Sequence, residues 1–416
     1  MKKLLLWLAM VILLVALLLG GAIGALYVMT DESALPQEQP TLGELALESI
    51  GYDWQVPILG GVVNKPYTQP PTLTVQKLGA FSEATPALAL PAWASRNGAV
   101  LTAPDGTVVL QGDAAAFNSY AYTQNGAYEL ELTLYQDGAA APPAKADGWY
   151  QYRVGYTVNL QPKAALATAR TAQGGVAVLT VTGILDGGTP ALETDLGTVW
   201  FRATADGFVG YIPVTYNAEG GDHVMTLTCG ALTQELTLTV TQSSYPTVTV
   251  PAEEESPAGA GTEYQNAIWP LYTQGSAEKL WTGAFTAPSA SGVSIAYGSV
   301  LMTNGARSGR ATGLYYAAPA GETVKAPQAG TVAYAGTLAL TGGTVVVDHG
   351  CGVKSYLFGL DAVSVQRGQT VALGDAVGTA SAEHRLIYEL RIGSKSVDPA
   401  DAIDGSGGLQ SKEGTA

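Results

Sequence analysis

The longest feature of the hydrophobic pattern is an almost unbroken apolar run at the N-terminus. It extends from Leu4 to Val28, follows Lys2 and Lys3, and precedes the acidic pair Asp31 and Glu32. As a helix the run would measure roughly 37 Å, enough to cross a bilayer with some tilt, whereas the apolar part of a cleaved signal is about 7–15 residues. The pattern therefore favours an uncleaved transmembrane anchor.

The flanking charges give this anchor an orientation. The two lysines lie on the short N-terminal side, which the positive-inside rule assigns to the cytoplasm. We expect a single-pass protein of the cell membrane with the bulk of the chain extracytoplasmic. The small residues from Gly20 to Ala25 leave a cleaved signal open as the alternative.

Beyond the anchor, apolar and polar positions alternate as they do in strands that are buried on one face. Clear examples are Tyr128, Leu130, Leu132 and Leu134, then Tyr150, Tyr152, Val154, Tyr156 and Val158, and then Leu236, Leu238 and Val240. Short strands of this kind, joined by Gly-containing turns, predict a mainly β protein. Two sets of them fit two immunoglobulin-like β-sandwich domains.

Segments rich in Pro, Gly and polar residues separate the patterned regions and suggest the domain boundaries. At 416 residues the chain is long enough for two or three domains. The expected order is a transmembrane anchor or signal at 1–30, an extracytoplasmic spacer at 31–71, Ig-like domains at 72–160 and 161–243, a Pro/Gly/Glu linker at 244–262, a C-terminal domain at 263–405 and a disordered tail at 406–416.

Charge and cysteine content narrow the function classes. The formal charge of −15 and the absence of a run of Lys or Arg exclude nucleic acid as an expected partner. Cys229 and Cys351 lie in different predicted domains, so a disulfide framework is not expected. His223 follows a GGD turn and is expected to be an exposed turn residue.

Motifs in the C-terminal domain resemble those of the M23 (LytM/lysostaphin-type) peptidase family. They are the pair Tyr297-Gly298, ATGLYYAAPAGETVKAPQAGTV (311–332), VVVDHGCGVKSYLFGL (345–360), VSVQRGQTVALGDAVGTA, and HRLIYELRIGSKSVDP (384–399), in the order in which the family has them. The resemblance implies an M23-type antiparallel β-sheet domain behind Ig-like β modules. Active members are zinc endopeptidases of peptidoglycan.

The family's zinc is held by two imidazoles and a carboxylate, with an open position for water. Carried over motif by motif, the first His ligand falls on Ala311, the Asp ligand on Tyr315 and the second His ligand on Ile387. The two histidines that act on the water and the oxyanion fall on Phe358 and Arg385. The resemblance therefore implies a degenerate member with no catalytic residues, no metal site and no cofactor.

Two histidines near these motifs, His349 and His384, are candidates for substitute ligands. In the family, His349 belongs to a turn rather than to the metal shell. His384 stands one position before the motif, and one residue of displacement on a strand turns a side chain to the opposite face. Neither is expected to rebuild a metal site.

The residues around the former cleft define a candidate binding groove. They are Tyr315, Tyr316, His349, Tyr356, Phe358, His384, Arg385 and Tyr388. Aromatic residues here either fill the void left by the metal or form a hot spot for a ligand. Degenerate relatives suggest a non-catalytic, membrane-anchored envelope protein that binds peptidoglycan or an envelope protein partner during cell-wall remodelling, division or sporulation.

Two other functions stay open. One is an active M23-type zinc metalloendopeptidase with an atypical site that uses His349, Asp348 and Glu389; stoichiometric zinc would favour it. The other is a structural or adhesive Ig-like surface protein, which binding mapped to residues 72–243 would favour.

Overall fold

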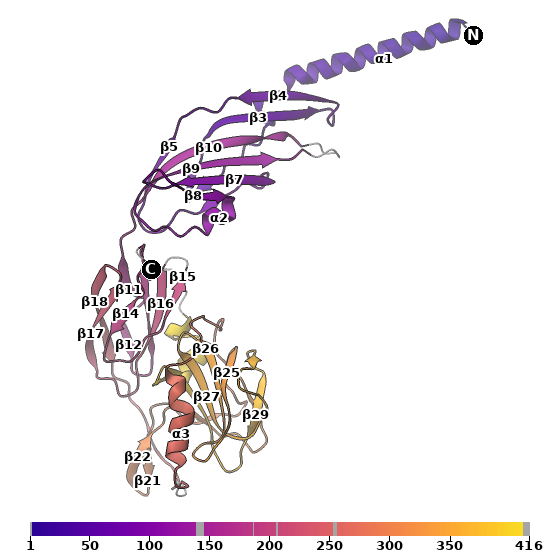
Figure 1. The fold of residues 1–416 in the computed structure, drawn as a ribbon. Coiled ribbons are helices and arrows are strands. Elements are labelled where there is room, and N and C mark those ends of the chain that lie inside the picture. The colour runs from indigo at the N-terminus through magenta and orange to yellow at the C-terminus, as the bar shows by residue number, and fades with distance from the viewer. Residues whose placement is uncertain (1, 139–144, 186, 205–206, 253–255, 411–416) are drawn as a thin grey trace. The chain divides into compact units, whose positions relative to one another are not determined.

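The computed structural model describes residues 2–138, 145–185, 187–204, 207–252 and 256–410 (Figure 1). It confirms a mainly β protein with an apolar N-terminal helix and several sheets. The chain separates into two compact units, residues 1–161 and 162–416.

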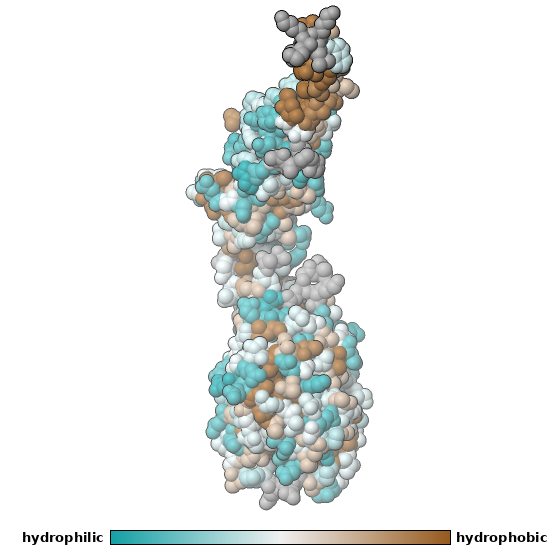
Figure 2. Space-filling model, turned by 90° about the vertical axis from the view of Figure 1, so that its right-hand side faces the viewer, coloured by the Kyte–Doolittle hydropathy of each residue, from teal (hydrophilic) through white to brown (hydrophobic). Residues whose placement is uncertain are grey.

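The first unit begins with helix α1 (Lys2–Met29). Its residues are apolar on every side, as in a helix that has no aqueous face, and the space-filling view shows it as a largely brown, hydrophobic surface (Figure 2). Within the described residues, Leu6–Met29 is the stretch long and apolar enough to cross a membrane, and none of it is buried. A signal sequence near the N-terminus would meet the same criterion.

The rest of the first unit is built from strands and two short helices. These are η1 (Glu32–Ala34), β1 (Thr41–Leu42), β2 (Leu45–Ala46), β3 (Ser49–Ile58), β4 (Val63–Gln69), β5 (Gln76–Phe81), β6 (Leu88–Ala89), β7 (Arg96–Thr102), β8 (Val108–Gly112), α2 (Ala114–Asn118), β9 (Gly126–Gln136) and β10 (Asp147–Val158). Among the described residues, the larger sheet has the order β4-β3-β10-β9-β7-β8, with β5 added parallel to β10. A smaller sheet has the order β2-β1-β6.

The segment 31–71, expected to be a spacer, contributes the hairpin β3–β4 to the larger sheet. Trp54, Val56 and Ile58 are buried at every second position of β3, so this stretch carries the period of a strand with one buried face. The Pro and Gly residues around it obscured that period. Residues 72–160 therefore share one sheet with residues 49–69.

The second unit starts with two facing four-stranded sheets. Their strands are β11 (Lys163–Leu166), β12 (Arg170–Ala172), β13 (Val176–Thr182), β14 (Ala191–Glu193), β15 (Phe201–Thr204), β16 (Gly207–Pro213), β17 (Gly221–Cys229) and β18 (Leu232–Thr241). The described strands order as β11-β13-β16-β15 and β12-β18-β17-β14. Leu179, Ile212, Met225, Leu227 and Leu238 are buried between the two sheets, which makes this segment a β-sandwich.

His223 is not the exposed turn residue that the GGD sequence predicted. It lies on β17 and is 8% exposed, not free in a turn. Its Nδ1 is 3.0 Å from both carboxylate oxygens of Asp195, and its Nε2 is 2.9 Å from the Glu219 carbonyl oxygen. Strand β17 already starts at Gly221, within the GGD sequence, so His223 is a strand residue and its ring is buried.

The remaining elements form the C-terminal domain. They are β19 (Thr247–Thr249), α3 (Ala260–Ile268), η2 (Trp269–Tyr272), β20 (Val293–Ile295), β21 (Val300–Thr303), β22 (Ala306–Arg310), β23 (Leu314–Tyr316), β24 (Thr323–Lys325), β25 (Gly330–Leu338), β26 (Gly342–Gly350), β27 (Val353–Val363), β28 (Thr370–Val371), β29 (Ala376–Ala380), β30 (Leu386–Ile392), β31 (Lys395–Val397), α4 (Pro399–Ile403) and η3 (Gly408–Gln410). The main path of the described sheet is β20-β23-β30-β27-β26-β25-β28, and β19, β21 and β22 form a separate small sheet.

One face of the main sheet shares a hydrophobic core with the sandwich. Val178, Val209 and Tyr211 of the sandwich belong to the same buried cluster as Trp281 and Tyr388 of the C-terminal domain. Such a continuous core is the packing of a single folding unit rather than of two domains joined by a flexible hinge.

The segments expected to be linker and tail contain ordered structure where the chain is described. In the range 244–262, β19 pairs with β21, and α3 begins at Ala260; residues 253–255 lie outside the described part. In the range 406–416, Leu409 is buried in the shared core and its carbonyl accepts a hydrogen bond from the Trp281 indole at 3.2 Å. Residues 411–416 lie outside the described part.

Candidate functional site

Three of the positions singled out by the resemblance form a row across the sheet. Tyr315 on β23 pairs in register with Ile387 on β30, and Ile387 pairs with Phe358 on β27. Directly opposed residues in antiparallel strands point to the same face. The sheet therefore brings together three positions that the resemblance assigns to functional residues of the family. Tyr315 and Ile387 stand at two zinc-ligand positions, and Phe358 stands at a catalytic-histidine position. All three side chains are apolar or aromatic.

Ala311 lies just before β23 and is fully buried. Its backbone is held on both sides, because Gly298 N donates to the Ala311 carbonyl at 2.8 Å and Ala311 N donates to the Ser299 carbonyl at 3.0 Å. The position is well fixed, but a methyl group offers no electron pair to a metal.

A short helical segment covers Phe358 and Ile387 of the row. Ile268 of α3 and Leu271 of η2 are buried in one cluster with Tyr356 and Phe358 of β27, and Ile387 packs against that cluster. Figure 1 shows α3 beside β26 and β27. Phe358 and Ile387 thus lie in a small hydrophobic cluster that the α3–η2 segment (260–272) covers, and Tyr315 does not belong to that cluster.

Aromatic contacts hold both ends of the α3–η2 segment against β27. The rings of Tyr264 and Phe358 have centroids 6.2 Å apart, and those of Tyr272 and Tyr356 are 6.4 Å apart. Tilted aromatic pairs at such distances add to the free energy gained by burial alone. In addition, Glu263 in the first turn of α3 accepts a hydrogen bond from Ala339 N at 2.9 Å.

A buried ion pair lies beside the row. The Glu389 carboxylate accepts from the Arg391 guanidinium at 2.6 Å, and the Thr312 hydroxyl donates to the other Glu389 oxygen. The guanidinium carbon is 5.5 Å from the Tyr272 ring centroid and 5.4 Å from that of Tyr356, a cation–π arrangement that holds η2 in place. Burial lowers the pKa of Arg391, but the Glu389 carboxylate outweighs it and the pKa is raised.

His349 belongs to the opposite, core face of the sheet. Its Nδ1 donates to the Ala329 carbonyl at 2.7 Å, which leaves Nε2 to accept from the Ser355 hydroxyl at 2.7 Å. The side chain is fully buried, and burial lowers its pKa to about 4, so the ring is neutral near pH 7. Both ring nitrogens are occupied, which is how a structural histidine is satisfied.

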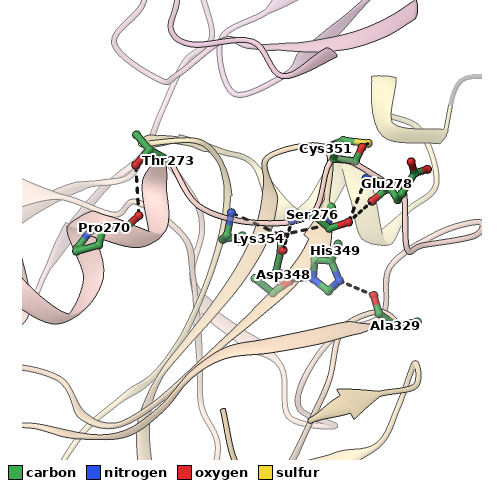
Figure 3. Close-up of polar contacts among 12 residues, drawn as sticks. Pro270, Thr273, Ser276, Glu278, Ala329, Asp348, His349, Cys351 and Lys354 are labelled. Atoms are coloured by element: carbon green, nitrogen blue, oxygen red, sulfur yellow. Dashed lines mark hydrogen bonds and ion pairs between the residues drawn. The ribbon is translucent and has the colours of Figure 1, made fainter. Parts of the chain in front are cut away.

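Asp348 and Lys354 form a third polar group (Figure 3). One Asp348 oxygen accepts from Ser276 N at 2.7 Å, and the other lies 3.5 Å from the Lys354 ammonium nitrogen. The Lys354 side chain is almost fully buried; burial lowers its pKa, and the Asp348 charge opposes that shift. Asp348, His349 and Glu389 are thus engaged in separate networks.

No group of three or more His, Cys, Asp or Glu side chains is placed to hold a metal ion within the described ranges. His384 and Arg385 are exposed, in a bend that precedes β30. Strand alternation therefore does not set the direction of His384; its ring lies against Gly342, where an added Cβ would be 2.6 Å from the ring.

The residues of the candidate groove do not form one open surface. Tyr356 and Phe358 lie under the α3–η2 segment, and Tyr316, His349 and Tyr388 are buried on the core face. The accessible rim consists of Tyr315, which is half-buried, with the exposed His384 and Arg385.

Sequence reasoning missed the α3–η2 segment and the Glu389–Arg391 pair. The signal for the segment was available: Tyr264, Ala267, Ile268 and Leu271 follow the i, i+3, i+4, i+7 spacing of an amphipathic helix. The segment directly follows a Pro/Gly/Glu-rich stretch. Because of that composition, the linker predicted at 244–262 includes the first residues of α3. For the ion pair, two charges at alternate positions of a strand indicate only a shared face.

Comparison with known proteins places this domain in a family. Residues 309–399 match the model for peptidase family M23, which confirms the predicted resemblance for the C-terminal domain. Among solved structures, a protein described as a peptidase M23 from Pseudomonas aeruginosa is 21% identical, covers 56% of this chain and 95% of its own, and has a TM-score of 0.44.

Two further structures show smaller likenesses. The catalytic domain of EnpA, a prophage-encoded M23 protein from Enterococcus faecalis, is 23% identical over 28% of this chain and 95% of its own, with a TM-score of 0.25. A chain of the SpoIIQ–SpoIIIAH pore-forming complex is 18% identical over 30% of this chain and 93% of its own, with a TM-score of 0.27.

Proposed function

We propose that the chain is a non-catalytic, membrane-anchored envelope protein whose M23-family domain holds a partner, either peptidoglycan or another envelope protein. The observation that carries this proposal is the row Tyr315–Ile387–Phe358, whose Ile387 and Phe358 lie under the α3–η2 segment. Active members of the family need metal ligands and an open, water-filled cleft at these positions, and here Phe358 and Ile387 are packed in a hydrophobic cluster.

Chemistry supports the loss of hydrolysis. Zinc-assisted attack needs a bound water whose pKa the metal lowers. Alanine and isoleucine offer no ligand atom, and a half-buried tyrosine phenol is not a substitute for an aspartate at neutral pH. Glu389, the nearest carboxylate on β30, is already committed to Arg391 and Thr312.

The location of the covered row also limits where a partner binds. Because α3 and η2 lie over Phe358 and Tyr356, the surface available to a partner is the rim of Tyr315, His384 and Arg385. An aromatic ring and an exposed guanidinium are common in interface hot spots.

Metal content and hydrolysis are the first test. The full chain, purified in detergent, is expected to contain far less than one zinc per chain and to release no muropeptides from isolated cell walls. One zinc per chain, together with muropeptide release that a chelator abolishes, would contradict the proposal and support the metalloendopeptidase alternative.

Binding is the second test, and a matched pair of arginines localises it. The full chain on a solid support is expected to retain wall fragments or an envelope protein, and Arg385→Ala is expected to reduce retention several-fold. Arg96→Ala, an exposed arginine paired with Asp137 in the first unit, is the control and should leave retention unchanged. Loss with Arg96→Ala but not with Arg385→Ala would favour the structural or adhesive alternative, in which residues 72–243 carry the binding.

A further inference from the structure

The turn between β3 and β4 exposes apolar side chains that the described residues of the first unit leave uncovered. Leu59 is 48% exposed and Val62 is 70% exposed, and Gly60 and Gly61 lie between them. The sequence PILGGVV, residues 57–63, contains no charged or hydroxyl side chain. A hairpin tip in water is normally polar, because turn positions favour Asn, Asp, Ser and Gly.

The backbone at this tip is also unusual. Leu59 has a φ of +49°, in the left-handed region that is unfavourable for a residue with a Cβ. Asn or Gly would adopt this conformation at lower cost. An apolar residue at such a position is explained if its side chain lies in an apolar environment.

Contacts to α1 show where the tip lies. The Lys65 ammonium on β4 donates to the Tyr27 carbonyl at 2.8 Å and to the Thr30 carbonyl at 2.6 Å, and the Tyr67 hydroxyl donates to the Thr30 carbonyl at 2.7 Å. These carbonyls belong to the C-terminal end of α1, where a positive charge is favourable.

The same contacts give the direction of the hairpin. From Tyr67 back to Lys65 the partners extend from Thr30 toward Tyr27, so β4 runs beside the last turn of α1 in the same sense as the helix. The tip therefore lies on the side of the body of α1, as Figure 1 shows. Strand β3, which leads into the tip, also contacts α1.

The depth of the tip follows from element geometry. Val62 precedes Lys65 by three residues, about 10 Å along a strand. That distance corresponds to about seven residues of helix, so the tip is level with the region of Gly20 and Gly21, inside the apolar stretch Leu6–Met29. Tyr27, Tyr67 and Lys65 then stand at the level where aromatic and lysine side chains mark a membrane boundary.

We propose that the β3–β4 tip, residues 59–62, inserts into the outer leaflet beside α1 as a second membrane contact. The ligand chemistry is the boundary between lipid headgroups and acyl chains, which accepts Leu and Val side chains and the uncharged turn. This inference rests on the proposed membrane anchor. Its consequence is that the first unit contacts the bilayer at two points, α1 and the β3–β4 tip. The second contact restricts rotation of the strands about the axis of α1.

The test places an environment-sensitive dye at the tip of the full chain. Leu59→Cys and Val62→Cys are labelled with NBD, and Leu73→Cys is the control because Leu73 is 86% exposed and follows the opposite end of β4. Cys229 and Cys351 are buried, so wild-type protein reports background labelling. Each chain is reconstituted into phosphatidylethanolamine–phosphatidylglycerol vesicles.

Dyes at 59 and 62 are expected to show blue-shifted emission, quenching by nitroxide-labelled lipid and protection from iodide, whereas the dye at 73 shows the reverse. If the chain floats with the vesicles but the dyes at 59 and 62 behave like the dye at 73, the tip contact is overturned and the anchor stands. A chain that fails to float overturns the anchor and the tip contact together.

Discussion

The two faces of the C-terminal sheet are covered by different partners, although their residues alternate along the same strands. On the core face, Leu357 and Tyr388 pack in a cluster that continues into the sandwich at Val209 and Tyr211. On the other face, Phe358 and Ile387 meet the α3–η2 segment. One face is thus part of the main core of the second unit, and the other supports a small satellite cluster.

This difference separates what holds the fold from what modifies the site. The core face needs its large side chains because they fill the space between two folded parts. The opposite face carries positions to which the resemblance assigns zinc chemistry, and a helix of nine residues with the η2 turn covers Phe358 and Ile387 among them. A helix that short is marginal alone, so its order depends on the row beneath it.

The largest effect is expected from the core face. Leu357→Ala should lower the free energy of unfolding of the second unit by about 3 kcal/mol, the usual size for a fully buried leucine that leaves a cavity. Chemical denaturation of the full chain, followed by tryptophan fluorescence, measures it. A loss below about 1 kcal/mol would show that the shared core relaxes around this position.

Its neighbour Phe358 tests the opposite face. Phe358→Ala should cost about 1–2 kcal/mol globally, less than for an ordinary core Phe, because the α3–η2 segment can open locally instead. Hydrogen exchange should become faster in residues 260–272 and stay unchanged in β13 and β16. Equal acceleration in the sandwich would mean that the two faces are not separable, and the comparison between them would fail.

The alternation in β9, β10 and β18 was enough to predict strands, because each has one buried and one wet face. The C-terminal motifs predicted the family domain because turn glycines and strand ends recur at fixed spacing. β3 escaped prediction because the prolines and glycines around it carried the signature of a spacer. The shared core was not predicted, because the sequence pattern around Val178 and Tyr211 is the same whether these residues pack within the sandwich or against another domain.

The candidate site was predictable only in part, for a related reason. A motif assigns positions such as Tyr315 and Ile387, and register then places them side by side. Whether that row is open depends on a distant upstream segment, 260–272, and no local pattern states what an amphipathic helix will cover. The direction of His384 was likewise inaccessible, since it depends on where β30 begins.

The smallest effect should come from pH. It compares His223 in the sandwich with His349 in the C-terminal domain, because the pKa values of these two histidines are shifted in opposite directions. Burial lowers the pKa of His223, but its hydrogen bonds to the Glu219 carbonyl and to Asp195 outweigh burial and raise it above 6.5. A raised folded-state pKa means that the folded state binds more protons, so this contribution is present below pH 6.5 and is lost as pH rises through the folded value. His349 has a pKa lowered to about 4, so its contribution is present above pH 6.5 and is lost as pH falls toward 4.

The two contributions separate in a difference experiment. Melting temperatures of wild type and His223→Gln, measured from pH 5 to 9, should differ most at the acidic end and converge above the raised pKa of His223. The pH dependence that remains in His223→Gln below pH 6.5 includes the contribution of His349, together with that of Asp398, whose pKa burial raises to about 6. If the difference were instead independent of pH, the His223 ring would be neutral in the fold, and its Nδ1 contact with Asp195 would be an ordinary hydrogen bond rather than an ion pair.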